Sequence, residues 1–157
     1  MDLFDIEPQH GIKFNYRGAS VDAELRPLWR ISLLVLILYK LCSGNKANLK
    51  KIQVLYALVS SDKKRVAYRG GLLSRENSNI RFDPLVDRAI DIGIGEKLFI
   101  IDDAKSIKLT PKGVQFAKKI DADSNLFILE SDFINAYSKS HFNDQRINNI
   151  IQGNIIC

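Results

Sequence analysis

The feature of this sequence that most constrains its fold is a pair of helix starts that flank a short β-hairpin. Asp83-Pro84 and Thr110-Pro111 each combine a capping side chain with a proline, which the first helical position tolerates. Between them, Leu98–Ile101 and Ile107–Leu109 have the composition of short strands, and Asp102–Lys105 has that of a turn. The sequence therefore predicts a helix, a two-stranded hairpin and a second helix, in that order.

This order is typical of the second half of a winged helix, in which the hairpin is the wing and the helix before it takes the recognition position. Upstream, Arg26-Pro27 begins a leucine-rich helix, and a second helix is expected from about Ala47 to Ser60. We therefore expect an α+β, mostly helical chain with a winged helix-turn-helix domain over residues 26–122.

The flanks are predicted from shorter patterns. Ile12, Phe14 and Tyr16 alternate with polar residues, which predicts a strand or arm within residues 1–25. Residues 123–157 are expected to add two helices as a C-terminal extension of the same compact domain. The polar stretch 63–81 predicts no element beyond one short helix.

Composition and length exclude several classes of protein. A chain of 157 residues, 46% hydrophobic and 26% charged, is expected to form one soluble domain. Cys42 and Cys157 form no disulfide framework, and Cys42 is predicted to lie in the core. The acidic start of the chain is unlike a secretory signal, and the apolar run Leu28–Cys42 is too short to cross a bilayer. We expect a cytoplasmic protein without membrane contact.

The sequence predicts no catalytic residue, no cofactor and no metal. His10 and His141 lie at opposite ends of the chain, without other ligands at metal-binding spacing. Gly70-Gly71 lacks the lysine and hydroxyl residue of a phosphate-binding loop, and Asp102-Asp103 fits a turn. We therefore expect a binding protein rather than an enzyme.

Positive charge gathers in one part of the sequence. Residues 40–81 contain ten lysines and arginines against two acidic residues, a pattern that attracts phosphate backbones independently of base sequence. A solvated face that keeps the protein soluble explains the same pattern. With the two lysines of the hairpin, the candidates for nucleic-acid contact are Lys46, Lys50, Lys51, Lys63, Lys64, Arg65, Lys105 and Lys108.

The helix in the recognition position has the opposite charge. Asp83, Asp87 and Asp91 are spaced four apart and share one face, whereas a helix that reads the major groove offers Arg, Lys, Asn or Gln to base edges. Asp87 and Asp91 are therefore candidates for binding a protein partner. The isoleucine-rich tail gives three more candidates, for which core packing is the alternative: Ile147, Ile150 and Ile151.

Short motifs carry a resemblance to known families. Leu109–Gly113 resembles the strand-to-helix junction of winged-helix proteins, including MarR-type regulators. Arg26-Pro27, Phe82–Ala89 and Ile107–Phe116, taken in order, resemble the middle component of the bacterial ABC-three-component systems, which are anti-phage defence operons related to Lamassu. This second resemblance covers roughly residues 25–120.

The second resemblance implies a non-catalytic subunit that bridges an SMC- or RecN-like ABC ATPase and an effector, with DNA as a further, non-specific partner. The alternative is a winged-helix DNA-binding transcription regulator of the MarR type, expected as a dimer. The sequence leaves the effector, the trigger and the stoichiometry of the complex open.

Overall fold

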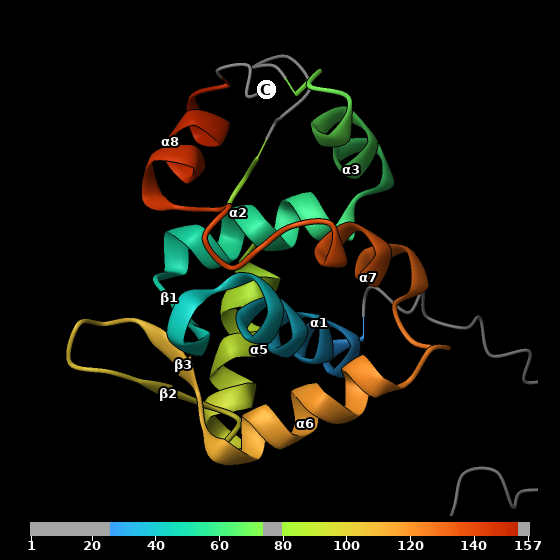
Figure 1. Ribbon diagram of the computed structural model, residues 1–157. Helices are drawn as coiled ribbons and strands as arrows, with labels where there is room; N and C mark the ends of the chain where they lie inside the picture. Colours follow the sequence, from blue (N-terminus) through green and yellow to red (C-terminus); the bar gives the residue numbers. More distant parts are fainter. Residues whose placement is uncertain (1–25, 74–79, 154–157) are drawn as a thin grey trace, which may run out of the picture.

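The computed structural model describes residues 26–73 and 80–153, so the strand or arm predicted within residues 1–25 lies outside it. In the described part the chain is α+β and mostly helical, with a small antiparallel sheet (Figure 1). The helices are α1 (Pro27–Leu41), the 3₁₀ turn η2 (Ser43–Asn45), α2 (Leu49–Ser60), α3 (Asp62–Arg69), α5 (Pro84–Gly95), α6 (Pro111–Ala122), α7 (Ile128–Asn135) and α8 (Asp144–Gln152). The strands are β1 (Lys46–Ala47), β2 (Phe99–Ile101) and β3 (Ile107–Leu109).

The predicted helix, hairpin and helix are confirmed as α5, β2–β3 and α6. Asp83 caps α5 by accepting a hydrogen bond from the backbone N–H of Leu85 at 2.9 Å. Thr110 caps α6 in the same way by accepting from the N–H of Gly113 at 3.0 Å. Both prolines stand in the first helical turn, where they break no hydrogen bond.

Strand β1 was not predicted, because two residues are too short to show a β period. We expected a helix from about Ala47, but α2 begins at Leu49 and Asn48 caps it by accepting from the N–H of Lys51. β1 pairs with β3, so the strand order is β1-β3-β2 and every pair is antiparallel. This topology is compatible with a winged helix.

Helix α1 lies at the centre of the described structure (Figure 1). It packs against α2, α5, α6 and α7, and its residues from Ile31 to Leu38 are all buried. This explains why nearly every face of the helix is apolar. Cys42 follows the helix and is fully buried as predicted, and burial raises the pKa of its thiol to about 11. Within the described ranges no helix is long and apolar enough to span a membrane.

Of the two C-terminal helices, α7 packs against both α1 and α2 (Figure 1). The first of the two helices predicted within residues 123–157 is α7, which begins at Ile128. Phe133 and Ile134 are buried, whereas Leu126 and Leu129 are exposed. Helix α8 packs on α2.

Gly113 allows α6 to pack closely on the hairpin. A Cβ atom at this position would lie 2.3 Å from the backbone oxygen of Leu98, which a side-chain rotation cannot relieve. Gly95, at the end of α5, has nothing within 4 Å of the equivalent position. The two glycines therefore form a matched pair for testing the packing.

We expect Gly113→Ala to lower the free energy of unfolding by about 2 kcal/mol, because the added methyl group forces α6 away from the hairpin. Gly95→Ala should leave the free energy unchanged or raise it by about 0.5–1 kcal/mol, because glycine is unfavourable in a helix. Urea titration monitored by circular dichroism measures both. Equal stability of the two variants would contradict the close approach of α6 to Leu98.

Candidate functional site

Four of the predicted cationic residues lie on the sheet, in its hairpin turn and in the first turn of α2, which follows β1 directly in the chain. Lys46 and Lys108 are exposed and directly opposite each other across the β1–β3 pairing. Lys105 is in the turn of the hairpin with a left-handed φ of 59°, and Lys50 is in the first turn of α2. We call these four residues the wing lysines. The Lys46 ammonium lies 3.6 Å from a carboxylate oxygen of Asp102.

The other basic candidates do not join the wing lysines. Lys63 and Lys64 belong to α3, which lies at the opposite end of the molecule from the hairpin (Figure 1). Lys51 is only half exposed. The prediction that Arg65 contacts nucleic acid is wrong. Its side chain is 7% exposed, pairs with Asp62 and donates to the backbone oxygen of Val59. Its charge is used to hold α3 on α2 and offers no surface to DNA.

Asp87 and Asp91 of α5 are both exposed, but Asp87 also contacts a buried residue of α2. Gln53 of α2 is 1% exposed and donates to a carboxylate oxygen of Asp87 at 2.9 Å. The same amide donates to the backbone oxygen of Asp83 and accepts from its N–H, at 3.1 and 3.0 Å. Asp87 therefore helps to fix α5 on α2, and Asp91 is the carboxylate one turn further along the exposed face.

Two of the three isoleucines that were candidates for binding a partner instead follow the alternative, core packing. Ile147 and Ile150 are 2% and 1% exposed, because they form the inner face of α8 where it packs on α2. They belong to the core of this chain and present nothing to a partner. Ile151, one turn after Ile147, is 40% exposed. The isoleucines of residues 154–157 lie outside the described residues.

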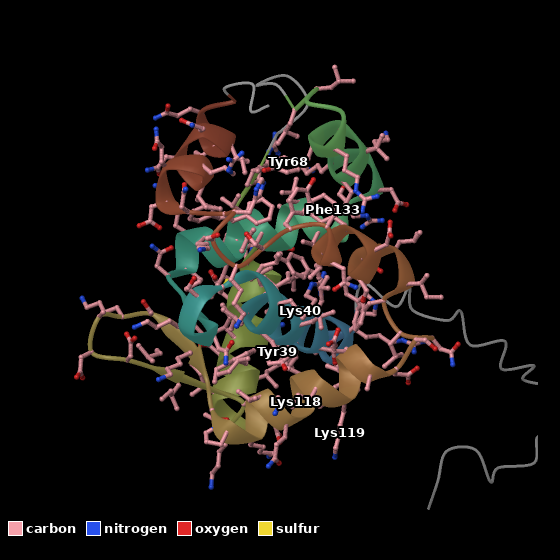
Figure 2. The ribbon with its side chains drawn as sticks, in the orientation of Figure 1. Tyr39, Lys40, Tyr68, Lys118, Lys119 and Phe133 are labelled. Carbon is pink, nitrogen blue, oxygen red and sulfur yellow. The ribbon has the colours of Figure 1, made fainter. Side chains whose placement is uncertain are left out.

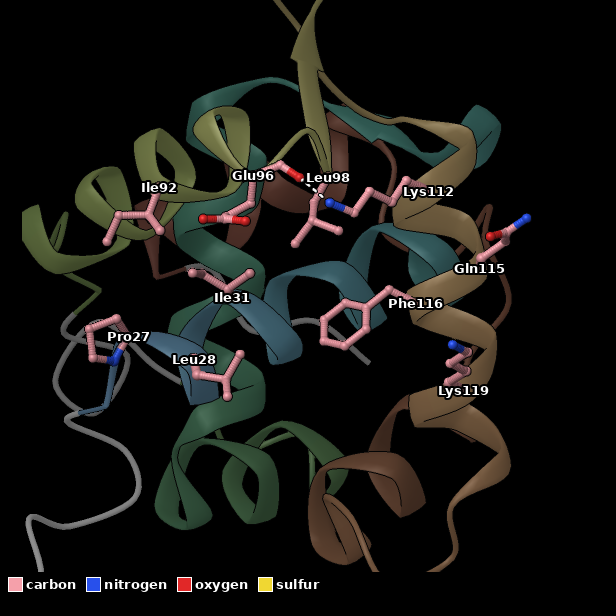
Figure 3. Close-up of a pocket in the computed structure, with 10 residues that line it drawn as sticks. All are labelled: Pro27, Leu28, Ile31, Ile92, Glu96, Leu98, Lys112, Gln115, Phe116 and Lys119. Atoms are coloured by element: carbon pink, nitrogen blue, oxygen red, sulfur yellow. Dashed lines mark hydrogen bonds between the residues drawn. The ribbon is translucent and has the colours of Figure 1, made fainter.

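A groove that the sequence analysis did not predict lies between the start of α1, the end of α5 and α6. It has a volume of about 660 Å³. Figure 3 shows Phe116 extending from α6 toward Leu28 and Ile31 of α1. The walls also include Pro27, Ile92 and Leu98, and the polar residues of the lining are Glu96, Lys112, Gln115 and Lys119. The sequence signal for this groove is Leu28, the first residue of the apolar run Leu28–Cys42, which is 68% exposed.

An aromatic cluster joins α3 to α7 and to the connection between α7 and α8, and it contains the one described histidine. The Tyr68 hydroxyl lies 2.6 Å from Nε2 of His141, and both rings contact Tyr137 and Phe142. Figure 2 shows Tyr68 and Phe133 at the opposite end of the molecule from Lys118 and Lys119 of α6. Burial lowers the pKa of His141, and the positive charge of Arg146 lowers it further. Burial also raises the pKa of Tyr68.

In residues 26–73 and 80–153, no group of three or more His, Cys, Asp and Glu side chains is placed to hold a metal ion. Asp102 is occupied in the hairpin turn, where the N–H of Ser106 donates to its carboxylate and holds the pKa of that group below its usual range.

Comparisons with known proteins give no assignment: no protein-family model, no curated protein and no solved structure matches the chain.

We expect the aromatic cluster to make stability depend on pH through His141. Its folded pKa lies below the ordinary value of 6.5, so below pH 6.5 the unfolded chain binds more protons and stability falls as the pH drops through the folded pKa. The melting temperature should therefore fall between pH 7 and about pH 5, and His141→Gln should reduce this fall. An identical pH profile in the variant would show that protonation of His141 is not coupled to folding.

Proposed function

We propose that this chain is a non-catalytic winged-helix subunit that bridges an SMC- or RecN-like ABC ATPase and an effector in an anti-phage defence complex. The succession α1, β1, α2, α3, α5, β2, β3, in which α3 and a connection separate α2 from α5, and the strand order β1-β3-β2 support a winged helix with α5 in the recognition position. The three sequence blocks of the resemblance fall at the start of α1, at the start of α5 and across β3 and α6.

The observation that carries the proposal is the charge of α5. Asp87 and Asp91 are exposed on the helix that would enter the major groove, where carboxylates meet the negative potential of DNA and offer no donors to base edges. A surface of this charge favours a protein partner with a basic surface. Because Gln53 fixes Asp87 and thereby α5, the acidic face is held in place before a partner binds.

Non-specific contact with DNA is a secondary part of the proposal. The wing lysines are exposed on β1, β3 and the start of α2, and such lysines contact phosphates without reading sequence. The same observation favours the alternative, a dimeric DNA-binding regulator of the MarR type, because lysines on a wing also support binding to an operator. The two functions differ in what α5 binds.

The decisive experiment is an affinity purification of the tagged full chain from its host, with and without nuclease, followed by mass spectrometry. Stoichiometric recovery of an SMC- or RecN-like ATPase that survives nuclease treatment supports the bridging subunit. Recovery of only this chain together with nuclease-sensitive DNA would reject the bridging subunit and support the regulator.

We expect Asp91→Lys to reduce recovery of the ATPase at least tenfold, because it reverses the charge of the exposed face without touching the Gln53 contact. DNA affinity should stay the same or rise, since the change adds a cation. Lys108→Glu is the matched control, with a charge reversal on the wing. It should weaken DNA binding and leave recovery of the ATPase unchanged. The opposite pattern in the two variants would contradict the assignment of α5 to a protein partner.

A further inference from the structure

The first 25 residues differ in charge from the rest of the chain. They contain five acidic and two basic residues, a net charge of −3, whereas the whole chain carries +5. Within them, Leu3–Glu7 combines the apolar side chains of Leu3, Phe4 and Ile6 with two carboxylates. We call Leu3–Glu7 the acidic segment. Its structure lies outside the described residues.

The groove between α1, α5 and α6 has complementary properties. Its walls are apolar and include Leu28, which is 68% exposed, and Phe116. The cations on its rim are Lys112 and Lys119 (Figure 3). Lys112 donates to the backbone oxygen of Glu96 at 2.8 Å, a neutral acceptor that leaves the charge of the ammonium uncompensated. The carboxylate of Glu96 is the single anionic group of the lining. The groove thus suits an apolar segment that carries more than one negative charge.

The acidic segment can reach the groove because the chain between them ends at the groove wall. Pro27 and Leu28 line the groove, so residues 1–25 end beside it. Residues 8–25 form a connection of 18 residues, and a chain of this length reaches at most roughly 60 Å. A segment tethered in this way has an effective concentration on the order of millimolar, so even a weak intrinsic affinity leads to occupancy.

We propose that the groove between α1, α5 and α6 binds the acidic segment of the same chain, with its apolar side chains against Leu28 and Phe116 and its carboxylates near Lys112 and Lys119. Binding of the acidic segment covers the apolar surface that α1 leaves exposed and blocks the groove to other molecules. The proposal is independent of the proposed function, because it concerns the isolated chain without an ATPase or DNA.

The test uses a fluorescent peptide of residues 1–8 and two forms of the full chain. In the tail variant, Leu3→Asp, Phe4→Asp and Ile6→Asp remove the apolar contacts and leave the described domain unchanged. We expect the peptide to bind the tail variant at least tenfold more tightly than the natural chain, in which the tethered segment occupies the groove. Fluorescence anisotropy measures both affinities, and circular dichroism checks that both chains are folded.

Further changes in the tail variant locate the binding site. Lys119→Glu on the rim, or Leu28→Asp on the wall, should weaken peptide binding at least tenfold. Lys118→Glu is the matched control, because it makes the same charge change at the adjacent exposed position of α6, outside the groove lining (Figure 2). It should change the affinity less than twofold.

Three results would overturn the proposal. The first is no binding of the peptide to the tail variant, and the second is equal binding to both chains. The third is an equal effect of Lys118→Glu and Lys119→Glu, which indicates charge attraction without a groove. Sedimentation of the natural chain tests the source of the segment: a dimer that is lost in the tail variant would assign the groove to a second copy and reject binding within one chain.

Discussion

The described structure depends on the burial of α1. Its residues from Ile31 to Leu38 are all buried, and nearly all of them are apolar. The helix is therefore stable only when other elements shield it from water on every side. The helices α2, α5, α6 and α7 supply this cover, although they are far apart in the sequence. The cover is incomplete at the first turn, where Leu28 remains exposed. The groove is thus a direct result of how the central helix is packed.

The parts of the fold that could be predicted were those with a local signal. Asp83-Pro84 and Thr110-Pro111 combine a cap and a proline at one place, and both helices begin there in the structure. Strand β1 has no such signal, because its two residues are defined by pairing with β3, about sixty residues later. A strand that forms only because it pairs with a distant segment cannot be recognised from its own residues.

The candidate site was predictable to a similar extent. The exposed face of α5 followed from the spacing of its aspartates, but the contact of Asp87 with Gln53 depends on how α2 packs on α5. Arg65 was predicted at the surface on charge, and Ile147 and Ile150 were candidates for an interface with core packing as the alternative, whereas packing places all three inside. Charge and hydrophobicity give the composition of a surface. Tertiary contacts decide which of the candidate residues lie at that surface.

The pairing of Lys46 with Lys108 has a consequence for the sheet itself. Like charges directly opposite each other on adjacent strands repel and weaken the pairing of β1 with β3. Asp102 offsets part of this repulsion from the turn end of β2, at 3.6 Å from Lys46. A phosphate between the strands would replace Asp102 as the counter-ion and tighten the sheet that binds it. Binding of an anion by these two lysines would therefore be thermodynamically linked to the pairing of β1 with β3, and each would be a measure of the other.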